Sequence, residues 1–98
     1  MTMTPEGKVK KQIRAFLNEH GDNVWWFEPV QSGYGKPALD FIACWYGRFL
    51  AIEAKRPGGK LRPRQRATAR AMQAAGARVL VCDGESVEDF KDAAYSPG

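Results

Sequence analysis

The stretch LDFIACWYGRFLAIEAK, which runs from Leu39 to Lys55, predicts a β-hairpin. Its two arms, residues 39–44 and 49–55, are rich in the apolar, β-branched and aromatic residues that favour strands. Gly47 lies in the turn between the arms, where it can adopt the positive φ of a tight hairpin loop. A two-residue loop at 46–47 and a four-residue loop at 45–48 both place Asp40 directly opposite Glu53.

This pairing gathers charged side chains at the end of an apolar hairpin. Because side chains alternate along a strand, Glu53 and Lys55 share one face, and Asp40 projects from that same face. The Cβ atoms of directly opposed residues lie about 4.5–5.5 Å apart, and like charges placed so close repel. Two facing carboxylates therefore predict a cation between them, provided that no bulge shifts the register.

The length and composition predict one folded domain spanning residues 1–98, with 44% hydrophobic and 27% charged residues. The N-terminus lacks the apolar segment of a signal peptide, and no apolar run reaches the ~20 residues that span a bilayer. We therefore expect a soluble, cytoplasmic protein that is not secreted and has no membrane partner.

The two cysteines, Cys44 and Cys82, lie in apolar runs and are expected in the core. Together with the single histidine, His20, they do not make the four ligands of a zinc site. We expect His20 in the last turn of a helix, where its charge suits the helix end.

A first helix is predicted from Pro5 to His20, because Thr4 is a good N-cap and Gly21 a good stop. Glu6 lies on the apolar stripe of this helix, either as a partner for the site or as a complement to the helix dipole. That stripe consists of Val9, Ile13, Phe16 and Leu17.

A strand over 23–30 follows, and Pro29 favours its end or an edge position. Trp25 and Trp26 are interpreted as core aromatics, with stacking on an unpaired base as the alternative. The loop at 31–37 lacks the Gly-Lys-Ser/Thr ending of a phosphate-binding loop, and a strand follows it, so no nucleotide cofactor is expected. Its glycines instead allow the backbone to approach a ligand beside Asp40.

The rest of the chain predicts a helix over Pro63–Gly76, a strand over Arg78–Cys82 and a helix from Glu85 or Ser86 to Ala94. Alanines at 67, 71, 74 and 75 form a small-residue face suited to close packing, while Gln65 lies on a more buried line. A meander of three strands followed by a βαβ unit predicts an α/β fold, with a mixed sheet flanked by helices.

The charge distribution is uneven around a net charge of +4. Six basic residues and no acid lie between Lys55 and Arg66, whereas acids gather after position 82. A basic block in a folded domain indicates either a polyanion partner or a solvated surface.

Asp40 on one arm and Glu53-Ala54-Lys55 on the other resemble the site of the PD-(D/E)xK nuclease superfamily. With Glu6 in the first helix and Gln65 after the Glu-x-Lys strand, the chain is most similar to the VRR-NUC family, in particular its stand-alone viral and bacterial members. The resemblance implies a restriction-endonuclease-like αβββαβ core. One departure is Leu39, which stands where the family often has a proline before the aspartate.

The resemblance implies hydrolysis of DNA phosphodiesters with Mg²⁺ or Mn²⁺. Asp40, Glu53 and the backbone carbonyl of Ala54 would bind the metal, and Glu6 would join them directly or through water. Lys55 would orient or deprotonate the attacking water, and Gln65 would position Lys55 or a site water. Physical chemistry favours the same roles, because Mg²⁺ prefers oxygen ligands and keeps several waters.

The partner implied is DNA, held through its phosphates by the basic side chains. A domain with no evident base-reading element favours recognition of branched DNA or a Holliday junction, whose symmetric cuts predict a homodimer. The alternatives are a non-catalytic basic DNA-binding module and a general duplex or repair nuclease. The expected DNA-binding residues are Lys8, Lys11, Lys36, Arg56, Lys60, Arg62, Arg64 and Arg66.

Overall fold

The computed structural model describes residues 3–31, 35–85 and 87–96. Within these ranges, no helix is long and apolar enough to cross a membrane. Gly33 of the predicted glycine loop and Ser86, one of the two predicted starts of the last helix, lie outside them. The elements are α1 (Pro5–Asn18), a 3₁₀ turn (Gly21–Asn23), β1 (Val24–Phe27), β2 (Phe41–Trp45), β3 (Arg48–Lys55), α2 (Pro63–Ala74), β4 (Arg78–Asp83) and α3 (Val87–Tyr95).

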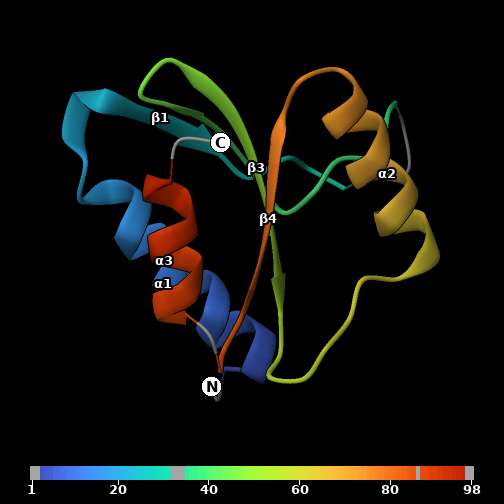
Figure 1. The fold of residues 1–98 in the computed structure, drawn as a ribbon. Helices are drawn as coiled ribbons and strands as arrows, with labels where there is room; N and C mark the ends of the chain where they lie inside the picture. The colour runs from blue at the N-terminus through green and yellow to red at the C-terminus, as the bar shows by residue number, and fades with distance from the viewer. Residues whose placement is uncertain (1–2, 32–34, 86, 97–98) are drawn as a thin grey trace.

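In the described part of the chain, the four strands form one sheet in the order β1-β2-β3-β4. The first three strands pair antiparallel, and β4 pairs parallel to β3 after the crossover through α2 (Figure 1). The predicted meander and βαβ unit are both confirmed. As an inner strand, β3 has neighbours on both sides and is buried from Leu50 to Lys55.

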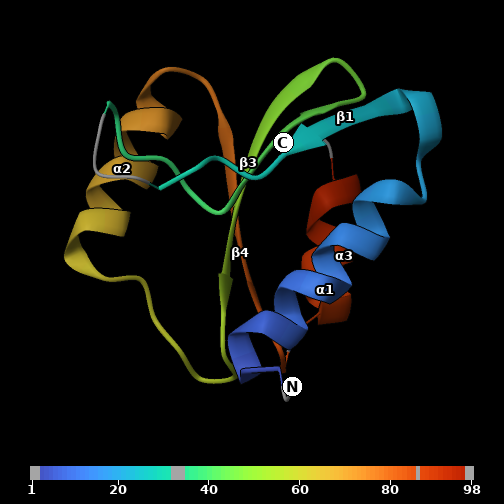
Figure 2. The same cartoon turned by 180° about the vertical axis from the view of Figure 1, so that it is seen from behind.

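Helices cover both faces of the sheet. Both views show α1 and α3 together on one side and α2 on the other (Figures 1 and 2). The larger core lies between the sheet and the α1–α3 pair, and includes Phe16 and Ile52. A smaller core lies under α2, where Leu39, Ala51 and Ala69 are buried. The predicted α/β class, with a mixed sheet flanked by helices, is therefore confirmed.

The first helix begins as predicted, because the Thr4 side chain accepts a hydrogen bond from the Gly7 N–H at 3.0 Å. It ends at Asn18 rather than His20, since the chain then turns into the 3₁₀ segment. The predicted helix-end role of His20 is therefore wrong. Its Nδ1 lies 2.8 Å from the Tyr46 hydroxyl, so the ring links the end of α1 to the hairpin turn.

The hairpin closes through a two-residue loop. Tyr46 has a φ of 47° and Gly47 a φ of 82°, the pair of positive values that defines a type I′ turn. The turn keeps the predicted register, in which Phe41 pairs with Ile52 and Trp45 with Arg48. No bulge displaces the ladder between these two pairs.

The strand before the loop is shorter than predicted, because β1 covers only Val24–Phe27. Asn23 belongs to the 3₁₀ turn, and Pro29 has no N–H to continue a ladder. Trp26 packs against the larger core and donates its Nε1–H to Asn18 Oδ1 at 3.1 Å. Trp25 points to the opposite face and is 69% exposed, so its predicted core position is wrong.

Two predictions of burial are also wrong. Cys44 is exposed, because its neighbours in the register, Trp25 and Phe49, lie on a part of the sheet that remains exposed. The alanines at 67, 71 and 74 of α2, and Ala75 directly after it, are exposed as well. The helix instead turns Ala69 inward, with Gln65 half-buried one turn before it, as predicted for that line.

Candidate active site

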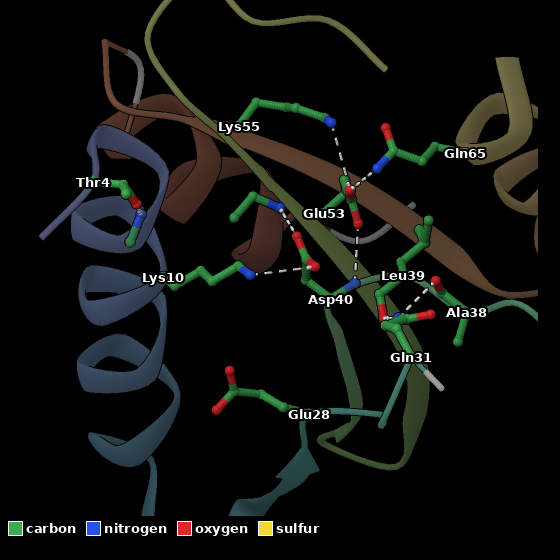
Figure 3. A network of polar contacts seen from close by, with 12 residues as sticks. Thr4, Lys10, Glu28, Gln31, Ala38, Leu39, Asp40, Glu53, Lys55 and Gln65 are labelled. Carbon is green, nitrogen blue, oxygen red and sulfur yellow. Dashed lines mark hydrogen bonds and ion pairs between the residues drawn. The ribbon is translucent and has the colours of Figure 1, made fainter. Parts of the chain in front are cut away.

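The structure brings Asp40 and Glu53 together across the end of the hairpin. Asp40 lies one residue before β2, and its backbone N–H donates to Glu53 Oε1 at 3.0 Å. In return, Asp40 Oδ2 accepts a hydrogen bond from the Ala54 N–H at 3.0 Å. The predicted opposition is confirmed, and each carboxylate is fixed by the backbone of the other strand (Figure 3).

Gln65, which lies on α2, reaches the same pair of carboxylates from a different element. Its Nε2 donates to Glu53 Oε2 at 2.6 Å, while its Oε1 accepts the Arg62 backbone N–H at 2.9 Å. Because the second bond also satisfies an N–H at the start of α2, it fixes which end of the amide faces Glu53. The structure thus brings Gln65 to the carboxylate pair, with Glu53 rather than the expected Lys55 as its direct partner.

Lys55 shares the face of Glu53, as the alternation along β3 predicted. Its Nζ lies 3.7 Å from Glu53 Oε2, and the two side chains are only 8% and 4% exposed. Burying a charged group is unfavourable unless it has a partner, so this pair depends on mutual compensation. Lys55 therefore lies beside the carboxylates, in a position from which it can act on a bound group.

The surroundings of Glu53 disfavour its ionised form. Burial, and next the charge of Asp40, raise the pKa of Glu53 from 4.5 to about 7. The hydrogen bond from the Asp40 backbone and the charge of Lys55 act in the opposite direction. At neutral pH the site therefore contains a carboxyl that is partly protonated, and added positive charge would favour its ionised form.

Lys10 is a further site residue, and the sequence interpretation did not select it. Its Nζ lies 3.7 Å from Asp40 Oδ1, on the α1 side of the site (Figure 3). Helical spacing already pointed to it, because Lys10 follows Glu6 by one turn and shares its face. On the same side, Arg14 binds Glu28 through two hydrogen bonds of 2.8 and 2.7 Å, and this lowers the pKa of Glu28.

Glu6 does not join the carboxylate pair. Among residues 3–31, 35–85 and 87–96, no three His, Cys, Asp or Glu side chains lie close enough together to hold a metal ion. Glu6 is half-buried in the first turn of α1, and Lys10, one turn later, is the α1 side chain in contact with Asp40. Within the described residues, Asp40 and Glu53 therefore form a pair of carboxylates that Glu6 does not extend to three.

The segment before Asp40 is held from two directions. Leu39, which stands in place of the expected proline, is fully buried under α2 with Ala51 and Ala69. The Gln31 side-chain amide donates to the carbonyls of residues 38 and 39 at 3.0 and 3.3 Å (Figure 3). Packing and hydrogen bonds thus fix the backbone that presents the aspartate.

A cleft of about 440 Å³ opens beside the carboxylates. Asp40, Glu53 and Gln65 lie in its lining, and three basic residues, Lys36, Arg62 and Arg64, contribute to its walls. All eight predicted DNA-binding residues are exposed. The five that do not line the cleft are Lys8, Lys11, Arg56, Lys60 and Arg66.

The donor set fits a hard divalent cation. Asp40 and Glu53 both lie in the lining of the cleft, and such ions bind through one or two carboxylates while keeping several waters. The raised pKa of Glu53 indicates a site where added positive charge is favourable.

The buried thiol of Cys82 lies in the larger core.

Comparisons with known proteins add no family to this geometry: no family model matches the chain, and neither the curated proteins nor the solved structures gave a match.

Proposed function

We propose that this protein is a metal-dependent endonuclease that hydrolyses DNA phosphodiester bonds. The observation that carries the proposal is the reciprocal bonding of Asp40 and Glu53 at a cleft with basic walls. A protein that only bound DNA would gain nothing from two carboxylates beside the phosphates, since like charges repel. A site for hydrolysis has a use for both features.

Asp40 and Glu53 would hold Mg²⁺ or Mn²⁺, with the backbone carbonyl of Ala54 as a further oxygen ligand. When bound, such an ion stabilises charge on the phosphate and makes a water molecule a better nucleophile. Gln65 holds one oxygen of Glu53 in place, so the carboxylate cannot rotate away from the pair. Glu6 stays a candidate for contact through water only.

Lys55 would orient the attacking water as an ammonium, or accept its proton as a neutral amine. Its ammonium lies 3.7 Å from Glu53 Oε2 and is 8% exposed, so it is held close to the reacting centre. Proton transfer by a positioned side chain contributes about 10²–10⁴-fold to rate. We therefore expect the loss of Lys55 to reduce the chemical step more than DNA binding.

The proposal includes the family. The element order helix, three strands, helix, strand, together with the positions of Asp40, Glu53, Lys55 and Gln65, supports a restriction-endonuclease-like core of the VRR-NUC type. Leu39 in place of the usual proline is compatible with it, because packing under α2 fixes the same backbone.

The preferred substrate we propose is branched DNA, such as a Holliday junction, cut by a homodimer in the cytoplasm of a bacterial or phage-infected cell. The described elements are three helices and one sheet, whose exposed basic side chains suit phosphates. Symmetric cuts on a junction require two sites related by a two-fold axis. A general duplex or repair nuclease uses the same chemistry and is the alternative.

The test is cleavage of duplex, flap, splayed-arm and four-way-junction DNA by the purified protein, with Mg²⁺, with Mn²⁺ and with EDTA. We expect metal-dependent cutting, fastest on the junction, with nicks at symmetric positions. Equal rates on duplex and junction would favour the general nuclease. DNA binding that weakens with salt, with no cutting of any substrate in either metal, would favour the non-catalytic binding module.

A further inference from the structure

The metal-free site is electrically balanced by side chains from two elements. Lys55 of β3 lies 3.7 Å from Glu53 Oε2, and Lys10 of α1 lies 3.7 Å from Asp40 Oδ1. In Figure 3 the two lysines reach the carboxylate pair from different elements. Each acid thus has an ammonium partner before any metal is present.

The two lysines are held differently. The side chain of Lys55 is 8% exposed, whereas that of Lys10 is 31% exposed and its partner Asp40 is 19% exposed. Both contacts are ion pairs at 3.7 Å, longer than a hydrogen bond, so the difference between them lies in their exposure to solvent. Solvent can replace Asp40 around Lys10 far more easily than it can replace Glu53 around Lys55.

The oxygen that Lys10 approaches is also the one left for a cation. Asp40 Oδ2 accepts the Ala54 N–H, whereas no hydrogen bond within the described chain is recorded for Oδ1, the oxygen nearest to Lys10. A metal ion held by Asp40 would therefore compete with the Lys10 ammonium for the same carboxylate. Two cations so close to one oxygen repel each other.

We infer that Lys10 is an exchangeable counter-ion of Asp40, which keeps the metal affinity of the DNA-free protein low. The inference rests on the metal site of the proposed function but not on hydrolysis itself. Lys10 thus acts on metal binding through Asp40, and its displacement accompanies metal entry. Its removal makes metal binding tighter, whereas loss of a merely structural contact would leave that affinity unchanged or weaken it.

The experiment is calorimetric titration of Mg²⁺, and separately Mn²⁺, into the wild-type protein and its variants without DNA. We expect Lys10→Gln to bind each metal about threefold to tenfold more tightly, as removal of one nearby positive charge predicts. Lys10→Arg keeps the charge and stays within about twofold of wild type. Arg70→Gln, an exposed change on α2 with the same loss of net charge, also stays within about twofold.

Unchanged or weaker metal binding by Lys10→Gln would overturn the inference, and so would the absence of metal binding in both wild type and variant. Thermal unfolding in EDTA confirms that each variant is folded before titration. A wild-type protein that binds metal, shows tighter binding on Lys10→Gln and yet cuts no DNA would overturn the nuclease proposal and leave the role of Lys10 intact.

Discussion

Glu53 is the residue on which the site converges. Its Oε1 accepts the Asp40 N–H, and its Oε2 meets both the Gln65 amide and the Lys55 ammonium. Burial and the Asp40 charge nevertheless raise its pKa to about 7, so the surrounding donors do not fully offset the loss of water. Any added positive charge near this carboxyl would favour its ionised form.

This raised pKa predicts a pH dependence of stability in EDTA. Because the folded pKa of about 7 exceeds the ordinary 4.5, the folded state binds more protons between those values, and stability falls as pH rises through them. Across the whole range, the free energy of unfolding falls by about 3 kcal/mol. Between about pH 4.5 and about pH 8, the free energy of unfolding in urea should therefore rise for Glu53→Gln relative to wild type.

The control is Glu28→Gln. Arg14 lowers the pKa of Glu28, so its contribution to stability is present above pH 4.5 and is lost as pH falls through the lowered value. Relative to wild type, this variant should show no change across the Glu53 window. A parallel pH response of wild type and Glu53→Gln would contradict the environment assigned to Glu53.

Gln65 yields a second prediction at the same scale. Gln65→Ala removes the donor to Glu53 and the acceptor for the Arg62 N–H, and we expect about 1–3 kcal/mol of destabilisation. Gln73→Ala, an exposed glutamine on the same helix, should stay within about 0.5 kcal/mol of wild type. Chemical denaturation measures the stability of the two variants. Equal losses of stability would show that the Gln65 side chain does not stabilise the contact between α2 and β3.

At the scale of elements, the hairpin turn sets the register that the site requires. Gly47→Ala places a Cβ at a φ of 82° and should destabilise the fold by about 1 kcal/mol, since the strain of the left-handed region outweighs the gain in chain stiffness. Gly47→Asn should cost less, because asparagine tolerates this region. Urea midpoints test the order, and an alanine variant as stable as wild type would contradict the type I′ turn.

The hairpin was predictable because the residues that specify it lie within one short stretch of sequence. The apolar arms, the glycine in the turn and the period-two alternation all depend on residues close in sequence, and together they placed Asp40 against Glu53. The chain order likewise predicted the parallel pairing of β4 with β3. Helical spacing predicted that Gln65 lies on the partly buried line of Ala69, while its assignment to the site came from the resemblance to the VRR-NUC family.

The failures concern which surfaces other elements cover. Cys44 and Trp25 have the composition of a core strand, yet their face of the sheet is exposed. The alanines of α2 were expected inward, but only one line of a helix meets a sheet, and Ala69 takes it. Helical spacing places Lys10 on the face of Glu6, but its contact with Asp40 depends on how α1 crosses the hairpin, which local sequence does not specify.

At the scale of the whole molecule, three basic side chains, Lys36, Arg62 and Arg64, contribute to the walls of the cleft that holds the carboxylates. If these residues bind phosphates, Arg64→Ala should weaken DNA binding on all sequences and reduce the slope of log K against log salt by about one. Arg70→Ala, exposed on the same helix outside the cleft lining, should leave the slope unchanged. Fluorescence anisotropy in EDTA over a range of salt concentrations distinguishes them, and identical slopes for both variants would contradict binding along this cleft.

The most direct test of the central claim is the rate of four-way-junction cleavage by wild type and Asp40→Asn in Mg²⁺. Asparagine keeps an oxygen for the Ala54 N–H and removes only the charge, so the fold and DNA binding should persist. We predict cleavage by wild type that EDTA abolishes, and a loss of about a hundredfold or more in the variant. Cleavage that survives EDTA, or that proceeds at the wild-type rate in Asp40→Asn, would contradict a metal-dependent site at Asp40 and Glu53.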